Sequence, residues 1–269
     1  MSLTAAFYTH AAAATGYAIF VALLAFWRTR TRLTAFMALA AAATSAWGIA
    51  WCFYDIGQLP AWAPTFSASV RDGGWLALML ATLAAGRPTD AVWRRLVTLA
   101  VVVLGIDLFF TATHFNLGVI AGVTVDYQLT RIATTILGLV LVENLLRNTS
   151  VDEFWAVKSL GIGLMAIFVF NLVLRIPQFL THIPDEGLVA ALPVVFLIAL
   201  PLFVVSAVRN PTLKLGIHSS RRIVFHTATL VGAGLLLQGT AVAAYYIRNY
   251  GGTTGTVLAV LLLFGALLT

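Results

Sequence analysis

The chain has 269 residues, of which 61% are hydrophobic and only 10% are charged. A soluble domain of this length needs far more charge to cover its surface, so the composition excludes a soluble fold. The formal net charge of +6 does not indicate nucleic-acid binding, because the basic residues are spread over separate junctions between apolar segments. The single cysteine, Cys52, excludes an internal disulfide and a cysteine-based metal site.

Apolar runs recur along the whole chain, each long enough to span a hydrocarbon core of roughly 30 Å as a helix. We predict an all-α, polytopic membrane helical bundle of about nine transmembrane helices, forming a single domain over residues 1–269. Pro177 is predicted to lie at the end of the sixth helix. The nine predicted helices cover residues 5–27, 33–54, 67–86, 93–113, 127–146, 156–176, 188–208, 223–247 and 253–269.

The positions of the basic residues predict the orientation of the bundle. Cytoplasmic loops are enriched in lysine and arginine, so the junctions that hold most of the 16 basic residues are predicted to be cytoplasmic. The N-terminus is then outside and the C-terminus inside. These basic residues are Arg28, Arg30, Arg32, Arg87, Arg94, Arg95, Arg147, Lys158, Arg209, Lys214, Arg221 and Arg222.

Polar residues at membrane depth mark a candidate site in the outer part of the predicted bundle. Asp107 lies in the outer third of its helix, and Arg131, Asn171 and Arg175 lie at a similar depth. Ionisable side chains at this depth are costly and usually face a bundle interior or a cavity. Two interpretations stay open: an ion pair between Asp107 and an arginine that fixes helix register, or a ligand site.

Further aromatic and polar residues gather on the same predicted side. Aromatic walls with a few convergent polar groups are typical of a small-molecule pocket, although aromatic residues near an interface also form belts. We hypothesise a pocket that opens outward. Its candidate ligand-binding residues, besides Asp107, Arg131, Asn171 and Arg175, are Trp51, Asp55, Trp75, His114, Gln238 and Tyr245.

The sequence predicts no cofactor, no metal site and no catalytic motif. HExxH, GxSxG and Walker glycine patterns are all missing from the sequence, so no complete active site is indicated. Two local features are structural predictions. Glu143 is expected to pair with Arg147 at i, i+4, and the small residues Ala40, Thr44 and Gly48 are expected to allow close helix contact.

Five short runs in the second half of the chain follow one another in order: 143–148 (ENLLRN), 154–158 (FWAVK), 209–211 (RNP), 220–227 (SRRIVFHT) and 246–252 (YIRNYGG). In this order they resemble the membrane-embedded N-terminal region of the PEP-CTERM-system sensor histidine kinases, which accompany exosortase and exopolysaccharide loci in Gram-negative bacteria. The resemblance covers roughly residues 140–269. One departure is the run Thr253-Thr254-Gly255, where the family is expected to carry a tryptophan.

The resemblance implies the sensor domain of a two-component system, embedded in the bacterial inner (cytoplasmic) membrane and surrounded by membrane lipids. It further implies an unknown small-molecule or lipid signal, a cytoplasmic kinase domain of the same polypeptide, a response regulator and a possible homodimer. The kinase region, an ATP-dependent phosphotransferase, is expected after residue 269.

The alternative is a small-molecule or lipid transporter or flippase, in which Asp107, Arg131 and Arg175 would line the path. No internal repeat is evident in the sequence, which weakens a transporter built from inverted halves.

Overall fold

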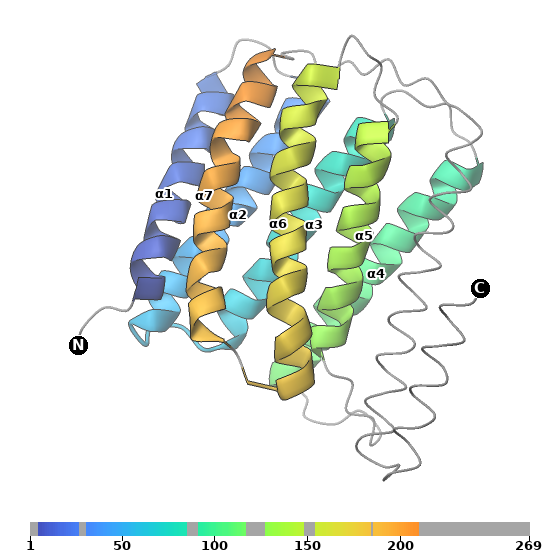
Figure 1. Ribbon diagram of the computed structural model, residues 1–269. Helices are drawn as coiled ribbons and strands as arrows, with labels where there is room; N and C mark the ends of the chain where they lie inside the picture. The colour runs from blue at the N-terminus through green and yellow to red at the C-terminus, as the bar shows by residue number, and fades with distance from the viewer. Residues whose placement is uncertain are drawn as a thin grey trace. The chain divides into compact units, whose positions relative to one another are not determined.

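The computed structural model describes residues 5–26, 31–84, 91–116, 127–147, 154–183 and 185–209. These residues form seven helices and no strand, which confirms the all-α prediction for this part of the chain (Figure 1). The predicted helices 223–247 and 253–269 lie outside the described residues. The observed helices are α1 Ala5–Phe26, α2 Arg32–Asp55, α3 Trp62–Ala84, α4 Ala91–Asn116, α5 Tyr127–Arg147, α6 Phe154–Thr181 and α7 Glu186–Arg209.

Two helices extend clearly beyond their predicted ends. α3 begins at Trp62 rather than Ser67, and Pro64 lies in its first turn, where the missing N–H removes no intrahelical bond. α6 continues to Thr181, so Pro177 lies inside it and not at its end as predicted. The helix stops at His182, which has a φ of 56° and donates its N–H to the Gln178 carbonyl at 2.9 Å.

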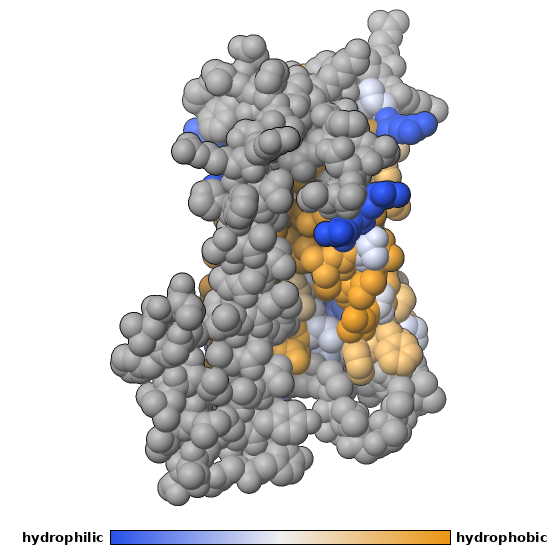
Figure 2. Space-filling view, turned by 90° about the vertical axis from the view of Figure 1, so that its right-hand side faces the viewer, coloured by the Kyte–Doolittle hydropathy of each residue, from blue (hydrophilic) through white to orange (hydrophobic). Residues whose placement is uncertain are grey.

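The helices have the length and composition of membrane spans. Six of the seven described helices are long and apolar enough to cross a membrane, which supports a multi-pass membrane protein. α4 exposes the apolar side chains Val101, Val102, Ile106 and Phe109 along one side. This apolar surface is visible on the side of the molecule in Figure 2.

α3 is the helix that falls short of a membrane span by composition, and it is shielded by its neighbours. Its Arg71 and Trp75 are fully buried, and Asp72 is nearly so. Neighbouring helices therefore replace lipid around the polar positions of α3, as membrane-buried charges require.

Six helices form a closed ring, with α4 outside it. Around the ring, α1 packs on α2, α2 on α3, α3 on α5, α5 on α6, α6 on α7, and α7 on α1. α4 packs against α3 and α5. Figure 1 shows α4 inclined along the α5 side of the bundle.

Large aromatic side chains fill the middle of the ring. Trp75 and Phe203 lie with their ring centroids 4.6 Å apart, and Trp47 and Phe196 lie 5.3 Å apart. The indole of Trp75 is hydrogen-bonded, since its Nε1 donates to Thr44 Oγ1 at 3.0 Å. Tyr17 donates its hydroxyl to the Phe196 carbonyl at 3.0 Å. The packing of these side chains and their two hydrogen bonds therefore hold α1, α2, α3 and α7 together.

The predicted close contact along α2 is present. Ala40 and Thr44 are fully buried, and a Cβ placed on Gly74 of α3 would lie 3.0 Å from the Ala40 Cα. On the α1 side, a Cβ on Gly48 would lie 2.8 Å from the carbonyl oxygen of His10. Small residues therefore allow α2 to approach both neighbours at backbone distance.

We expect Gly48→Ala to lower the free energy of unfolding by about 1–3 kcal/mol, because a backbone carbonyl cannot move aside as a side chain can. Gly105→Ala on α4 is the matched control, since nothing lies within 4 Å of its Cβ position. Thermal unfolding in detergent, followed by tryptophan fluorescence, compares the two variants. Equal melting temperatures would contradict the close α1–α2 packing.

Candidate functional site

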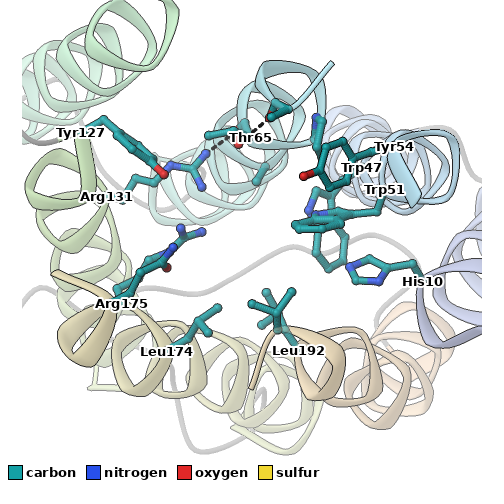
Figure 3. Close-up of a pocket in the computed structure, with 15 residues that line it drawn as sticks. His10, Trp47, Trp51, Tyr54, Thr65, Tyr127, Arg131, Leu174, Arg175 and Leu192 are labelled. Carbon is teal, nitrogen blue, oxygen red and sulfur yellow. Dashed lines mark hydrogen bonds between the residues drawn. The ribbon is translucent and has the colours of Figure 1, made fainter. Parts of the chain in front are cut away.

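A cavity of about 290 Å³ lies at one end of the ring, where α1, α3, α5 and α7 begin and α2 and α6 end. Every helix of the ring contributes to its wall, as Figure 3 shows for the labelled side chains. The lining residues are His10, Trp47, Trp51, Tyr54, Ala61, Pro64, Thr65, Ala68, Tyr127, Arg131, Leu174, Arg175, Gln178, Val189 and Leu192.

One wall of the cavity is aromatic. The His10 ring stacks on Trp51 at 4.9 Å and meets the edge of Trp47 at 5.0 Å between centroids. Trp51 in turn meets Tyr54 edge-on at 5.5 Å. The three α2 residues lie at i, i+4 and i+7 and therefore share one helix face.

His10 has a defined hydrogen-bonding role in this wall. Its Nδ1 lies 2.7 Å from the Ala6 carbonyl oxygen, which can only accept, so Nδ1 carries a proton. In the neutral ring Nε2 is then an acceptor. Nε2 is buried and has no hydrogen-bond partner.

Two arginines form the opposite wall. Arg131 and Arg175 are only 4% and 7% exposed. An Nη atom of Arg131 donates to the Thr65 carbonyl and to Ser69 Oγ, while its Nε has no partner. Arg175 donates from Nη1 to Gln128 Oε1 at 3.3 Å. Within the described residues, neither guanidinium forms a salt bridge with a carboxylate.

A third arginine lies deeper in the ring and is paired. Arg71 is fully buried, and its Nη2 lies 2.7 Å from Asp72 Oδ1. Its guanidinium carbon lies 4.2 Å from the Trp47 ring centroid and 4.6 Å from that of Phe196. Asn171 accepts a further hydrogen bond from Nη2 at 3.5 Å. This cluster joins side chains of α2, α3, α6 and α7.

The ion pair that was one of the two interpretations of Asp107 is not present in the described part of the chain. Asp107 is buried and accepts a hydrogen bond from Thr130 Oγ1 at 2.9 Å, and none of the described arginines forms a salt bridge with it. Thr130 and Arg131 are consecutive on α5 and project about 100° apart. Thr130 therefore meets α4 outside the ring, while Arg131 enters the cavity.

The other candidate residues divide between the cavity and the core. Trp51, Arg131 and Arg175 line the cavity, whereas Trp75 and Asn171 belong to the packed interior. Asp55 is the last residue of α2 and is not among the lining residues. His114 lies in α4 with its side chain not described, and Gln238 and Tyr245 lie outside the described residues.

The lining residues His10, Thr65 and Tyr127 were not among the residues predicted to line a pocket. The spacing of Trp47, Trp51 and Tyr54 was a usable signal for a shared face. His10 carried no such signal, because its place depends on how α1 packs against α2.

The end of the ring opposite the cavity carries basic residues. The predicted Glu143–Arg147 pair is confirmed there, with Oε1 and Nη2 2.6 Å apart. Arg32, Arg94 and Lys158 lie in the first turns of α2, α4 and α6, which begin at this end.

These features define the class of the molecule: a multi-pass membrane protein in which a ring of helices encloses an arginine-containing cavity. Comparison of the chain with protein-family models, with curated proteins and with solved structures finds no match.

We expect Asp72→Asn to reduce the free energy of unfolding by roughly 3–5 kcal/mol, because it leaves the fully buried Arg71 without a counter-charge. Asp107→Asn should cost less than about 1 kcal/mol, since the amide oxygen still accepts from Thr130. Unfolding by a denaturing detergent in mixed micelles measures both. A larger loss for Asp107→Asn than for Asp72→Asn would contradict this assignment.

Proposed function

We propose that this chain is the membrane-embedded input domain of a sensor histidine kinase, and that its signal binds in the cavity at the end of the ring. The observation that carries the proposal is that all six helices of the ring line one cavity. A single ligand in this position would contact every helix of the ring at once. Its binding energy would then depend on how the helices are placed, which is the requirement for shifting a conformational equilibrium.

The charge distribution supports an outward-facing cavity. Arg32, Arg94, Arg95, Arg147 and Lys158 belong to helix ends on the side opposite the cavity. Under the positive-inside rule that side is cytoplasmic, and the N-terminus of α1 is outside. A signal would then reach the cavity from the outer face or from the outer leaflet of a bacterial inner membrane.

Transport is the less well supported alternative. The middle of the ring, below the cavity, is occupied by four fully buried side chains, those of Trp75, Phe196, Phe203 and Met37. These side chains belong to one hydrophobic core, which fills the middle of the ring in the described part of the chain. A ring whose middle is filled by side chains favours a sensing domain over a transporter.

The first test is the reading frame that follows the codon of Thr269. A sensor kinase requires a cytoplasmic helical segment with a phosphoacceptor histidine, followed by an ATP-binding domain. A frame that continues into a soluble domain of another class, or stops, would remove the kinase from the proposal and make transport the next function to test.

We expect the double variant Arg131→Gln, Arg175→Gln to change the autophosphorylation rate of the full-length protein by about fivefold or more, in the range of ordinary coupling energies. Neutral side chains remove the repulsion between two buried cations and so imitate the state in which an anion is bound. The measurement is incorporation of labelled phosphate from ATP in lipid nanodiscs. Arg94→Gln, Arg95→Gln at the opposite end is the control variant.

The outcome that contradicts a sensing role is an equal rate for wild type, double variant and control, with all three folded. Uptake assays with the same proteins in sealed proteoliposomes address the alternative directly. Transport that is lost in the double variant would support a carrier in place of a sensor.

A further inference from the structure

The buried charges near the cavity do not balance. Among the described residues at this end of the bundle, three arginines are buried, Arg71, Arg131 and Arg175, but only two carboxylates, Asp72 in the ring and Asp107 on α4 outside it. Asp72 forms a salt bridge with Arg71, and Asp107 accepts a hydrogen bond from Thr130. Residues 210–269 contain no aspartate or glutamate.

The two cavity arginines have no salt bridge among the described residues and are therefore suited to binding an anion. A buried, unpaired guanidinium is unfavourable, and an anion that enters beside it gains charge-assisted hydrogen bonds. Arg131 has a free Nε, and Arg175 uses one of its five N–H donors on Gln128. Figure 3 shows both guanidinium groups on one side of the cavity.

On the other side of the cavity, His10 can accept a hydrogen bond from a ligand that carries a donor. His10 Nε2 is an unpartnered acceptor, held in place by the bond from Nδ1 to Ala6 and by stacking on Trp51. Figure 3 shows His10 across the cavity from Arg131 and Arg175, with Leu174 and Leu192 along the wall between them. A ligand with a hydroxyl at the end remote from its acid group would satisfy both walls.

The middle of the cavity and its size restrict the rest of the ligand. Trp51, Leu174 and Leu192 present apolar surface between the polar ends. The volume of about 290 Å³ lies near the lower limit of roughly 300 Å³ for small-molecule sites. This size suits a compact ring better than a long chain.

We infer that the cavity binds a small hydroxylated aromatic acid, with its carboxylate at Arg131 and Arg175, its ring against Trp51 and its hydroxyl donating to His10 Nε2. This inference deepens the proposed function and rests on it for the role of the ligand as a signal, but the binding itself is measurable without a kinase. An anionic lipid headgroup shares the same anion chemistry and is the source that the experiment must separate.

The experiment measures the melting temperature and the tryptophan fluorescence of the purified chain in neutral detergent. The acidic probes are para-hydroxybenzoate, para-hydroxyphenylacetate and para-hydroxycinnamate. The matched probes are para-hydroxybenzamide, which lacks the charge, and benzoate, which lacks the hydroxyl. We expect at least one acidic probe to raise the melting temperature saturably and to change the fluorescence of Trp47 and Trp51, with each matched probe binding about tenfold or more weakly.

Two variants assign the contacts. Arg175→Gln should abolish the response to the acid while Arg95→Gln, on the exposed surface of α4, keeps it. His10→Phe retains a ring that can stack on Trp51 but has no acceptor, so it should bind para-hydroxybenzoate and benzoate equally. This loss of discrimination is a readout that a merely structural histidine would not give.

Three outcomes would overturn the inference: no response to any of the three acids, a response that survives in Arg175→Gln, or stabilisation by phosphatidylglycerol alone and not by the acids. The last outcome would assign the anion site to a lipid. Failure here is distinct from failure of the sensing role. Acid binding without any change in autophosphorylation would support the binding site and contradict the sensing role. Altered autophosphorylation without acid binding would support the sensing role and contradict the acid as its ligand.

Discussion

The arrangement of this bundle depends on one fully buried arginine. Arg71 lies against the rings of both Trp47 and Phe196 and is neutralised by Asp72, its neighbour in the chain. In a membrane this charge is tolerable only where protein surrounds it on all sides. α3 must therefore lie where other helices shield it, and α2, α6 and α7 supply the side chains that do so. Cation–π contacts with desolvated rings, at about 2 kcal/mol each, offset part of the cost of burying the guanidinium.

The place of α4 follows from the same constraint. α3 is too polar for direct contact with lipid on every side, and α4 covers its outer flank together with that of α5. α4 can occupy the outside because its exposed side chains are apolar, with Val101, Val102 and Phe109 among them. The polar helix α3 can therefore take part in the ring because the apolar helix α4 covers it from outside.

The helices could be predicted from the sequence, but the side-chain contacts between different helices could not. Of the nine predicted helices, the seven in the described part of the chain are present, and five of them match to within three residues at each end, because apolar length sets a membrane span. The Glu143–Arg147 pair was predicted because it is local, with both residues on one face of one helix. Of the two interpretations left open for Asp107, the ion pair has no counterpart among the described salt bridges, because depth alone does not fix direction. Thr130 and Arg131 are adjacent at a similar depth, and the rotation of α5 decides that Thr130 meets Asp107. The burial of Arg71 and Asp72 inside the ring depends on packing between helices that are distant in sequence.

Trp47 connects the cavity to the buried ion pair. One part of its side chain lines the cavity, and its ring lies against Arg71, which is bonded to Asp72 and Asn171. Phe196 of α7 contacts both Trp47 and Arg71. A ligand that presses on Trp47 therefore acts on the contacts that hold α2, α3, α6 and α7 together. Close-packed interiors change by discrete rearrangement and not by smooth compression. A ligand that displaces Trp47 would therefore shift the helices packed around it.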